Sequence, residues 1–332
     1  MSLVEVRPVH PVQPVQPVQH APAPRQPERS RPSVTVVVPT KDRPLLLVRA
    51  LRSVLGQEYD GDIECIVVFD QDETHEPSVP TSAGRTVRVV RNARTAGLAG
   101  SRNTGYVLAT GELLAACDDD DEWLPGKLEA QVTLLLSHPE ASLASTGIVI
   151  RYDGRDIPRD AQSAELSFDD FLQDRHMQVH PSTYLARRTA VVDGYGLVDE
   201  EIPGGYAEDY EWLLRASRTG NVVCVQQRLV RVHWHAASFF TSRWDMIDEA
   251  LTWLIEREPA FARSSRGLGR IEGQLAFANA ARGRRRVALR WFGSAVRHHP
   301  TSRQAWAALP VAARLVSADR VVAAGRRLGR GV

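Results

Sequence analysis

Between residues 33 and 121, short apolar runs rich in β-branched residues alternate with segments whose apolar residues recur at helical spacing. The runs SVTVVVPT (33–40) and IECIVVFD (63–70) are typical of buried parallel strands, and Pro44 opens a helix between them. A third run, TVRVVRN, precedes a glycine-bearing turn and helix, after which LLAAC leads into four aspartates. This alternation predicts an α/β fold with a doubly wound sheet, whose ligand lies at the carboxyl ends of the strands.

Two flanking segments divide the 332-residue chain into three parts. Residues 1–32 contain eight prolines and no glycine, and the three-residue period of HPVQPVQPVQH is typical of polyproline II, so we expect a disordered arm. Residues 33–242 form the main domain. From residue 243 to 332 the pattern is helical without strands, which predicts an all-α appendage. Within it, residues 275–300 resemble a short tetratricopeptide helix pair.

Composition narrows the class of protein. A hydrophobic fraction of 43% and a charged fraction of 24% exclude a wholly disordered or collagen-like chain. No apolar stretch reaches the roughly 18 residues that a membrane-spanning helix needs. The three cysteines, Cys65, Cys117 and Cys224, stand in apolar, strand-like surroundings without CxxC spacing. They indicate reduced core thiols, as in a cytoplasmic protein.

The formal net charge of +1 conceals an uneven distribution, because residues 282–332 carry twelve arginines and one acidic residue, Asp319. This basic end has two explanations. It contacts anionic lipid at the inner face of a membrane, or it docks against the acidic main domain. Nucleic acid is not an expected partner, since no recognition module accompanies the charge.

Acidic side chains follow two of the expected strands. Asp70 ends the second strand, and residues 118–121 are four consecutive aspartates that follow the fourth. Clustered carboxylates without nearby Lys or Arg repel one another, and a hard divalent cation such as Mn²⁺ or Mg²⁺ relieves that repulsion. A solvated acidic loop is the alternative. The apolar strand that leads directly into the cluster favours the metal site.

Five motifs, in order and spacing, resemble the family 2 glycosyltransferases of the GT-A fold, over about residues 33–240. They are PTKDR, VVFD, AGLAGSRNTG, LLAACDDDDEWLPGKLEAQ and GGYAEDYEWLLRASRTG. The resemblance implies that Asp118 and Asp120 hold the metal and the diphosphate of a nucleotide sugar, with Asp119 as a ribose or sugar contact.

The resemblance also implies a nucleotide pocket. It assigns Asp70 to the nucleobase, with Pro39 and Thr40 as the wall beside it and Arg102 at the diphosphate, near a helix N-terminus. A carboxylate accepts a hydrogen bond from an imide N–H, which uracil, thymine and guanine possess. The expected donor is therefore a UDP sugar, with dTDP and GDP sugars as alternatives.

Inverting transfer to a hydroxyl group requires one general base, and Asp209 matches the family's base. Its neighbour Glu208 is expected to be a structural or acceptor-positioning partner. Trp212 is a candidate on the acceptor side, although tryptophans at such positions more often fill the core. Two histidines follow the last expected strand. At most one of them is expected to face the diphosphate, and His235 is preferred over His233 as that phosphate or metal contact.

Two other functions remain open from the sequence. The helical end would suit a scaffold or partner-binding subunit whose transferase domain is degenerate, but the intact acidic motif and the Glu208–Asp209 pair argue against it. A sugar nucleotidyltransferase also uses such a sheet and a metal. It would need a glycine-rich triphosphate loop near the start of the domain, and PTKDRP has no glycine.

Overall fold

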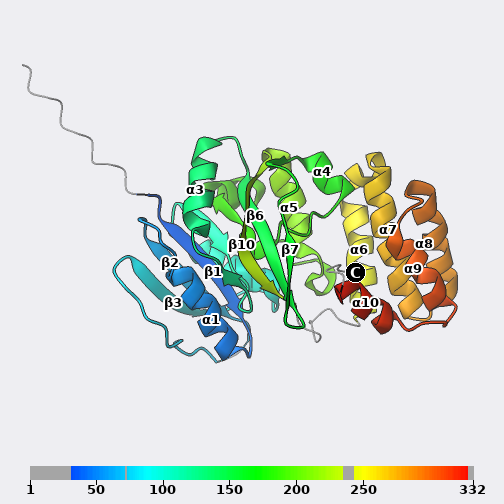
Figure 1. Ribbon diagram of the computed structural model, residues 1–332, viewed down its shortest axis with the longest axis horizontal. Helices are drawn as coiled ribbons and strands as arrows, with labels where there is room; N and C mark the ends of the chain where they lie inside the picture. Colours follow the sequence, from blue (N-terminus) through cyan, green and yellow to red (C-terminus); the bar gives the residue numbers. More distant parts are fainter. Residues whose placement is uncertain (1–30, 72, 235–242, 328–332) are drawn as a thin grey trace, which may run out of the picture. The chain divides into compact units, whose positions relative to one another are not determined.

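The computed structural model describes residues 31–71, 73–234 and 243–327 (Figure 1). The described strands are β1 (Val34–Thr40), β2 (Ile63–Phe69), β3 (Arg85–Arg91), β4 (Leu113–Ala116), β5 (Glu122–Trp123), β6 (Leu143–Tyr152), β7 (Arg155–Arg159), β8 (Glu165–Leu166), β9 (Leu185–Arg187) and β10 (Val222–His233). The described α-helices are α1 (Pro44–Leu55), α2 (Leu98–Leu108), α3 (Lys127–Ser137), α4 (Phe168–Gln173), α5 (Glu208–Thr219), α6 (Trp244–Arg257), α7 (Ser265–Ala281), α8 (Arg285–His298), α9 (Arg303–Ala312) and α10 (Ala318–Arg327).

These strands form one mixed sheet, in the order β3-β2-β1-β4-β9-β6-β10-β5, with β7 on β6 and β8 on β10. Strands β1 to β4 pair in parallel, whereas β9 runs antiparallel to both β4 and β6. The predicted α/β alternation of the first half is confirmed, and its strands end on one edge as parallel strands must.

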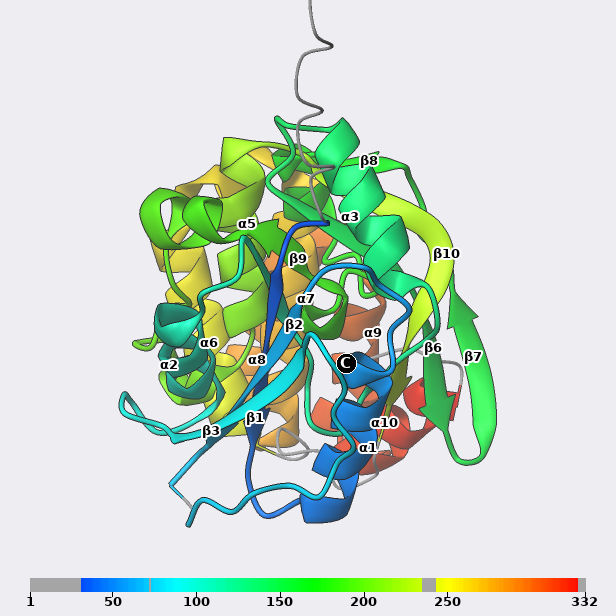
Figure 2. The same cartoon turned by 90° about the vertical axis from the view of Figure 1, so that its left-hand side faces the viewer.

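Successive residues of the buried strand β1 face opposite layers. Val36 and Val38 pack in a core with the apolar faces of α1 and α3, whereas Val37 packs in a second core with α2 and α5. Figure 2 shows this division, with α2 on one side of β1–β3 and α1 and α3 on the other. Burial on both faces explains why β1 reads as a continuous apolar run.

The three cysteines lie inside this architecture. Cys65, Cys117 and Cys224 are buried and form no disulfide, as expected from their apolar surroundings. Burial raises the pKa of both the Cys65 and the Cys224 thiols to about 12. They are therefore protonated side chains that fill the core, and none of them is a reactive thiolate.

Beyond residue 243 the described chain is helical, as predicted. Leu251 of α6 and Leu275 of α7 belong to the same core as the α5 side of the sheet, so these helices pack directly on the main domain. Helices α7 and α8 form the pair expected within 275–300, and α7 to α10 share a further apolar cluster. The likeness to a tetratricopeptide repeat and the boundary at 242/243 stay predictions, and residues 1–30 lie outside the described residues.

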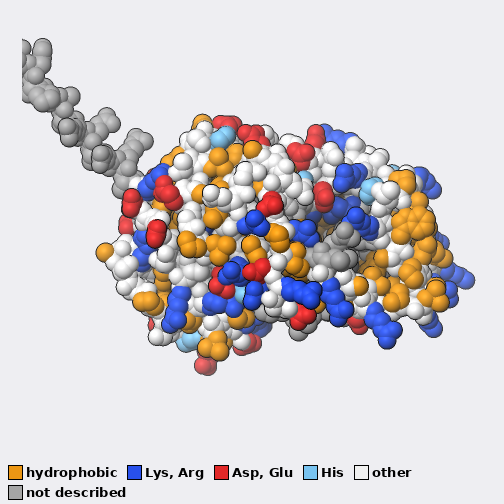
Figure 3. Space-filling model, in the orientation of Figure 1, with side chains coloured by type: hydrophobic (Ala, Val, Ile, Leu, Met, Phe, Trp, Pro, Cys, Tyr) orange, Lys and Arg blue, Asp and Glu red, His pale blue; other side chains and the backbone are white. Residues whose placement is uncertain are grey.

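The surface of these last helices mixes apolar and basic side chains. Val287 and Leu289 of α8 and Trp306 of α9 are 37%, 52% and 50% exposed. Figure 3 shows apolar side chains, in orange, beside blue arginines over the helices at the right of the view. No helix of the described residues is long and apolar enough to cross a bilayer.

Candidate functional site

A cleft of about 1060 Å³ opens at the carboxyl ends of β1, β2 and β4, where the sequence predicted a ligand site. Its wall includes the predicted residues Pro39, Thr40, Asp70 and the aspartates 118–121. The helical region also contributes, through Trp244 and Met246 near the start of α6 and Arg326 of α10. No sequence pattern predicted that contribution, because the contact joins segments about 200 residues apart.

Asp70 lies at the end of β2 and is 9% exposed. Its Oδ1 accepts hydrogen bonds from the Gly97 backbone N–H at 3.0 Å and from Asn92 Nδ2 at 2.9 Å. These bonds orient the carboxylate at the cleft wall. The position agrees with the prediction that Asp70 meets the nucleobase, which stays a prediction.

The acidic loop is compensated by arginines, contrary to the expectation that no cation lies near it. Arg43, just before α1, donates from Nη1 to Asp119 Oδ1 at 3.1 Å and to Asp120 Oδ2 at 2.9 Å. Thr40 Oγ1 donates to Asp119 Oδ2 at 2.7 Å. Asp119 is thus engaged by the end of β1, and Asp120 points toward Arg43.

The remaining carboxylates retain strong mutual repulsion. Burial, together with Asp118 and Asp119, raises the pKa of Asp120 to about 7, although Arg43 opposes the rise. Burial, together with Asp118 and Asp120, raises the pKa of Asp121 well above its ordinary value. Buried like charges at these distances favour binding of a cation or a proton.

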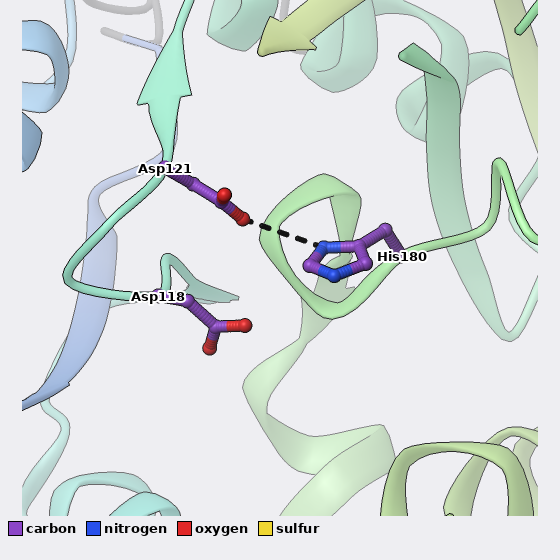
Figure 4. Close-up of side chains that lie close together, drawn as sticks. All are labelled: Asp118, Asp121 and His180. Carbon is purple, nitrogen blue, oxygen red and sulfur yellow. Dashed lines mark ion pairs between the residues drawn. The ribbon is translucent and has the colours of Figure 1, made fainter. Parts of the chain in front are cut away.

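Three side chains have the spacing of a metal site. Ligand atoms of Asp118, Asp121 and His180 all lie within 4.8 Å of one another (Figure 4). His180 Nδ1 is 3.5 Å from Asp121 Oδ2, and burial lowers the pKa of His180, which favours the neutral imidazole that binds metals. Two carboxylates and one imidazole are a donor set that suits Mn²⁺.

This set differs from the predicted one. Asp118 is common to both, but Asp121 and His180 stand where Asp120 and His235 were expected. His235 lies outside the described residues, and His233 Nε2 lies 2.7 Å from Glu122 Oε1. The sequence pattern did not identify His180, because this residue lies in a loop about 60 residues after the aspartates.

One serine holds the two acidic ligands in place. Ser182, in the short 3-10 helix Pro181–Thr183, donates from Oγ to Asp121 Oδ2 at 2.5 Å, and its Oγ accepts the Asp118 backbone N–H at 3.0 Å. His180 is the N-cap of the same short helix, because its Nδ1 accepts the Ser182 N–H at 3.3 Å. The loop therefore positions all three candidate ligands together.

The position of Arg102 contradicts the prediction made from the sequence. Its side chain was expected to meet the diphosphate, but it is buried at 2% exposure behind the acidic loop. It donates to Asp118 Oδ1 at 2.7 Å and to Glu208 Oε1 at 2.5 Å. Burial alone would lower the pKa of Arg102, but these two carboxylates hold it above its ordinary value. Arg102 lies one turn inside α2 on the face that packs inward, so it braces the site from behind.

The Glu208–Asp209 pair opens helix α5, as the sequence indicated. Arg175 Nη2 donates to both carboxylate oxygens of Asp209 at 2.7 Å. Burial alone would raise the pKa of Asp209, but Arg175 holds it below its ordinary value. Burial raises the pKa of Glu208 to about 7 against the opposing influence of Arg102. Arg175 was missed, since a lone arginine in an irregular segment carries no pattern.

Trp212 was a candidate for the acceptor side, and its position contradicts that prediction. Its side chain is 3% exposed and stacks on Tyr184 with ring centroids 5.5 Å apart, and its Nε1 donates to the Gly196 carbonyl at 2.9 Å. It lies in the core rather than on the acceptor side, because it follows the α5 face that packs on the sheet.

Comparisons with known proteins agree with this architecture. The family model "Glycosyl transferase family 2" matches residues 35–194. The Escherichia coli enzyme UDP-Glc:alpha-D-GlcNAc-diphosphoundecaprenol beta-1,3-glucosyltransferase WfgD is 31% identical over 107 residues. That alignment covers 32% of this chain and 42% of the relative, so the chain spans less than half of the relative's length.

Two solved structures share the fold. S. aureus TarS 1–349 in complex with UDP-GlcNAc has a TM-score of 0.55 and 14% identity, over 90% of this chain and 92% of that one. The mannosyltransferase PcManGT from Pyrobaculum calidifontis, in complex with GDP-Man and Mn²⁺, has a TM-score of 0.53 and 18% identity, over 91% and 81%. The strand order, the acidic strand end and the family match lead to one conclusion: residues 35–194 carry a glycosyltransferase family 2 domain, in a chain with a GT-A fold and a helical C-terminal region.

Proposed function

We propose that this chain is a metal-dependent, inverting glycosyltransferase, which moves a sugar from a nucleotide diphosphate to a hydroxyl group. The observation that carries the proposal is the gathering of Asp118, Asp121 and His180 in the cleft that Asp70 also lines. The carboxylate proposed to bind the nucleobase, Asp70, and the cation site for the diphosphate therefore lie in the same cavity. Release of a nucleoside diphosphate from a nucleotide sugar, in the presence of Mn²⁺, tests the proposal.

The residues that would hold Mn²⁺ or Mg²⁺ are Asp118, Asp121 and His180. When bound, the cation would offset the charge of the diphosphate as it leaves. Asp119, which is hydrogen-bonded to Thr40 and Arg43, would contact the ribose or the sugar. Backbone N–H groups at the start of α2, which lines the cleft, would add hydrogen bonds to the phosphates.

The proposed donor is a UDP sugar, with dTDP and GDP sugars as alternatives. Asp70, oriented by Gly97 and Asn92, would accept the imide N–H of the base. The two structural neighbours that share the fold hold UDP-GlcNAc and GDP-Man, which are nucleotides of this imide-bearing kind. Pro39 and Thr40 would form the wall beside the base.

Asp209 is the proposed general base. Because its pKa is held below the ordinary value, it is ionised at neutral pH, the state needed to accept the proton of the acceptor hydroxyl. Its carboxylate rests on Arg175, so the acceptor must compete with that ion pair. Glu208 acts as a positioning residue through Arg102, which in turn fixes Asp118.

The proposed acceptor is a glycan on a lipid carrier, and the WfgD relative is named for a diphosphoundecaprenol-linked acceptor. Such an acceptor places the enzyme at a membrane surface. The exposed apolar side chains Val287, Leu289 and Trp306 lie among the arginines of α8 and α9, a mixture that suits anionic headgroups.

Contact with an anionic membrane has a direct test. The full chain should sediment with phosphatidylglycerol vesicles at low salt and less at physiological salt, because exposed charges are screened. A chain ended near residue 282 should lose this sedimentation. Equal sedimentation of the two chains, or equal binding to neutral vesicles, would contradict membrane contact through the arginine-rich end.

A further inference from the structure

A second cavity, of about 490 Å³, lies between α4 and the C-terminal helices. It shares no wall residue with the nucleotide cleft. The residues that line it are all polar or charged, and they include Asp174, Arg266, Arg270, His299, Ser302 and Arg303. Its volume is in the range of cavities that hold small organic ligands.

Positive charge dominates this cavity. Three arginines face a single carboxylate, Asp174. Arg266 and Arg270 are one helical turn apart on α7, a spacing at which like charges destabilise a helix. Among the described residues no carboxylate forms an ion pair with Arg266 or Arg303, whereas Arg218 and Arg282 are each paired with an acidic side chain.

Polar hydrogen-bond capacity also remains unused there. The Nε of Arg270 is buried and has no acceptor among the described residues, although its Nη2 donates to Tyr210 Oη at 2.8 Å. A buried donor without a partner is costly, and an acceptor oxygen bound in the cavity would remove that cost. Burial and the adjacent Arg266 lower the pKa of His299, so this imidazole is neutral and can donate without charge repulsion.

The backbone is shaped to bring these groups together. A Cβ at Gly273 would lie 2.4 Å from Ser302 Oγ and 3.1 Å from Ala305 N, and one at Gly269 would lie 2.6 Å from His299 Cβ. These two glycines, one turn apart on α7, let the start of α9 and the preceding loop approach α7 closely. The N-terminus of α9, capped by Ser302, therefore opens beside the arginines of α7.

We propose that this cavity binds a phosphate group, carried either by a soluble phosphomonoester or by a lipid headgroup. Arg266, Arg270 and Arg303 supply guanidinium donors that match phosphate oxygens in geometry, and the free N–H groups at the start of α9 add a favourable dipole. The volume leaves room for the substituent that carries the phosphate.

The site borders the candidate base without being part of the cleft. Asp174 precedes Arg175, which holds Asp209, and Arg270 contacts Tyr210, the residue after Asp209. The inference nevertheless does not rest on the proposed transferase activity, because phosphate binding can be measured without turnover.

The test is calorimetric titration of the full chain with inorganic phosphate and with glycerol 3-phosphate, in EDTA at low salt, so that no cation retains phosphate in the nucleotide cleft. The Arg266→Gln/Arg303→Gln variant removes two exposed, unpaired charges, so its fold should be kept, and its Tm is measured as a check. Arg286→Gln/Arg290→Gln, on the exposed side of α8, is the matched control with the same loss of charge.

We expect one saturable site in the native chain, at least tenfold weaker binding in Arg266→Gln/Arg303→Gln and unchanged binding in the control. Absence of saturable binding, or equal weakening in both variants, would overturn the inference. Vesicles of phosphatidylcholine with and without phosphatidic acid identify the source. The vesicle result counts where binding to phosphatidic acid requires Arg266 and Arg303. If glycerol 3-phosphate displaces the protein from these vesicles, the site also binds soluble phosphomonoesters. If it does not, the ligand is the lipid headgroup.

Discussion

Replacing Asp209 with asparagine should lower kcat by about 10²–10⁴-fold and leave the affinity for the nucleotide sugar nearly unchanged, because general-base catalysis contributes in that range. Asparagine keeps the size of the side chain and one oxygen for Arg175, which donates to both oxygens of Asp209. It cannot take a proton from the acceptor. A steady-state assay of kcat, with donor affinity measured by calorimetry, separates the two effects.

Asp248→Asn is the matched control for this change. Asp248 lies in α6 and, like Asp209, is mostly buried and paired with an arginine, Arg282. It takes no part in the proposed chemistry, so kcat should stay within about threefold of the native value. A kcat for Asp209→Asn as high as that of the control would remove Asp209 as the base.

Replacing Asp121 with asparagine should abolish the Mn²⁺-dependent part of UDP affinity, a loss of at least tenfold, because a neutral amide is a poor ligand for a hard cation. The side chain is 1% exposed and accepts hydrogen bonds from Ser182 and from the His233 N–H. Asparagine keeps an acceptor oxygen of the same shape, so the loop should keep its conformation. UDP is titrated in Mn²⁺ and in EDTA.

Asp120→Asn decides between the two ligand sets. The carboxylate of Asp120 rests on Arg43 rather than on His180, so this variant should keep most of the Mn²⁺ effect. The opposite pattern, with the effect lost in Asp120→Asn and kept in Asp121→Asn, would favour the set implied by the family resemblance. Thermal stability in EDTA checks that neither change has unfolded the site.

The parallel half of the sheet could be predicted because its signals are local. A buried strand needs only its own β-branched run, and helix α1 needs only Pro44 and its apolar spacing. The location of the acidic loop at the ligand site could be predicted, because parallel strands end on one edge of the sheet. These inferences required no knowledge of distant contacts.

The partners of the acidic residues could not be predicted in the same way. Arg43, Arg175 and His180 reach the site from different segments, and the sequence does not specify which side chains meet after folding. Arg102 shows the limit within a single helix. Its position near the start of α2 suggested an exposed phosphate contact, but the rotation of the helix on the sheet turns it toward Asp118 and Glu208.

The contribution of the helical region to the cleft could not be predicted for the same reason. The apolar face of α6, with Ile247, Leu251 and Leu254, predicts that the helix packs on something. It does not say which surface receives it. Only the shared core with α5 brings Trp244 and Met246 to the edge of the cleft.

The central claim is inverting, cation-dependent transfer from a nucleotide diphosphate sugar, and time-resolved proton NMR tests it most directly. The native chain is mixed with α-linked UDP, dTDP and GDP sugars, in Mn²⁺ and in EDTA, and the anomeric signals are followed. We predict that one donor is consumed only with Mn²⁺, that its nucleoside diphosphate is released, and that the first product carries the β configuration. Consumption that is equal in EDTA, a first product that keeps the α configuration, or no consumption of any donor would contradict the account.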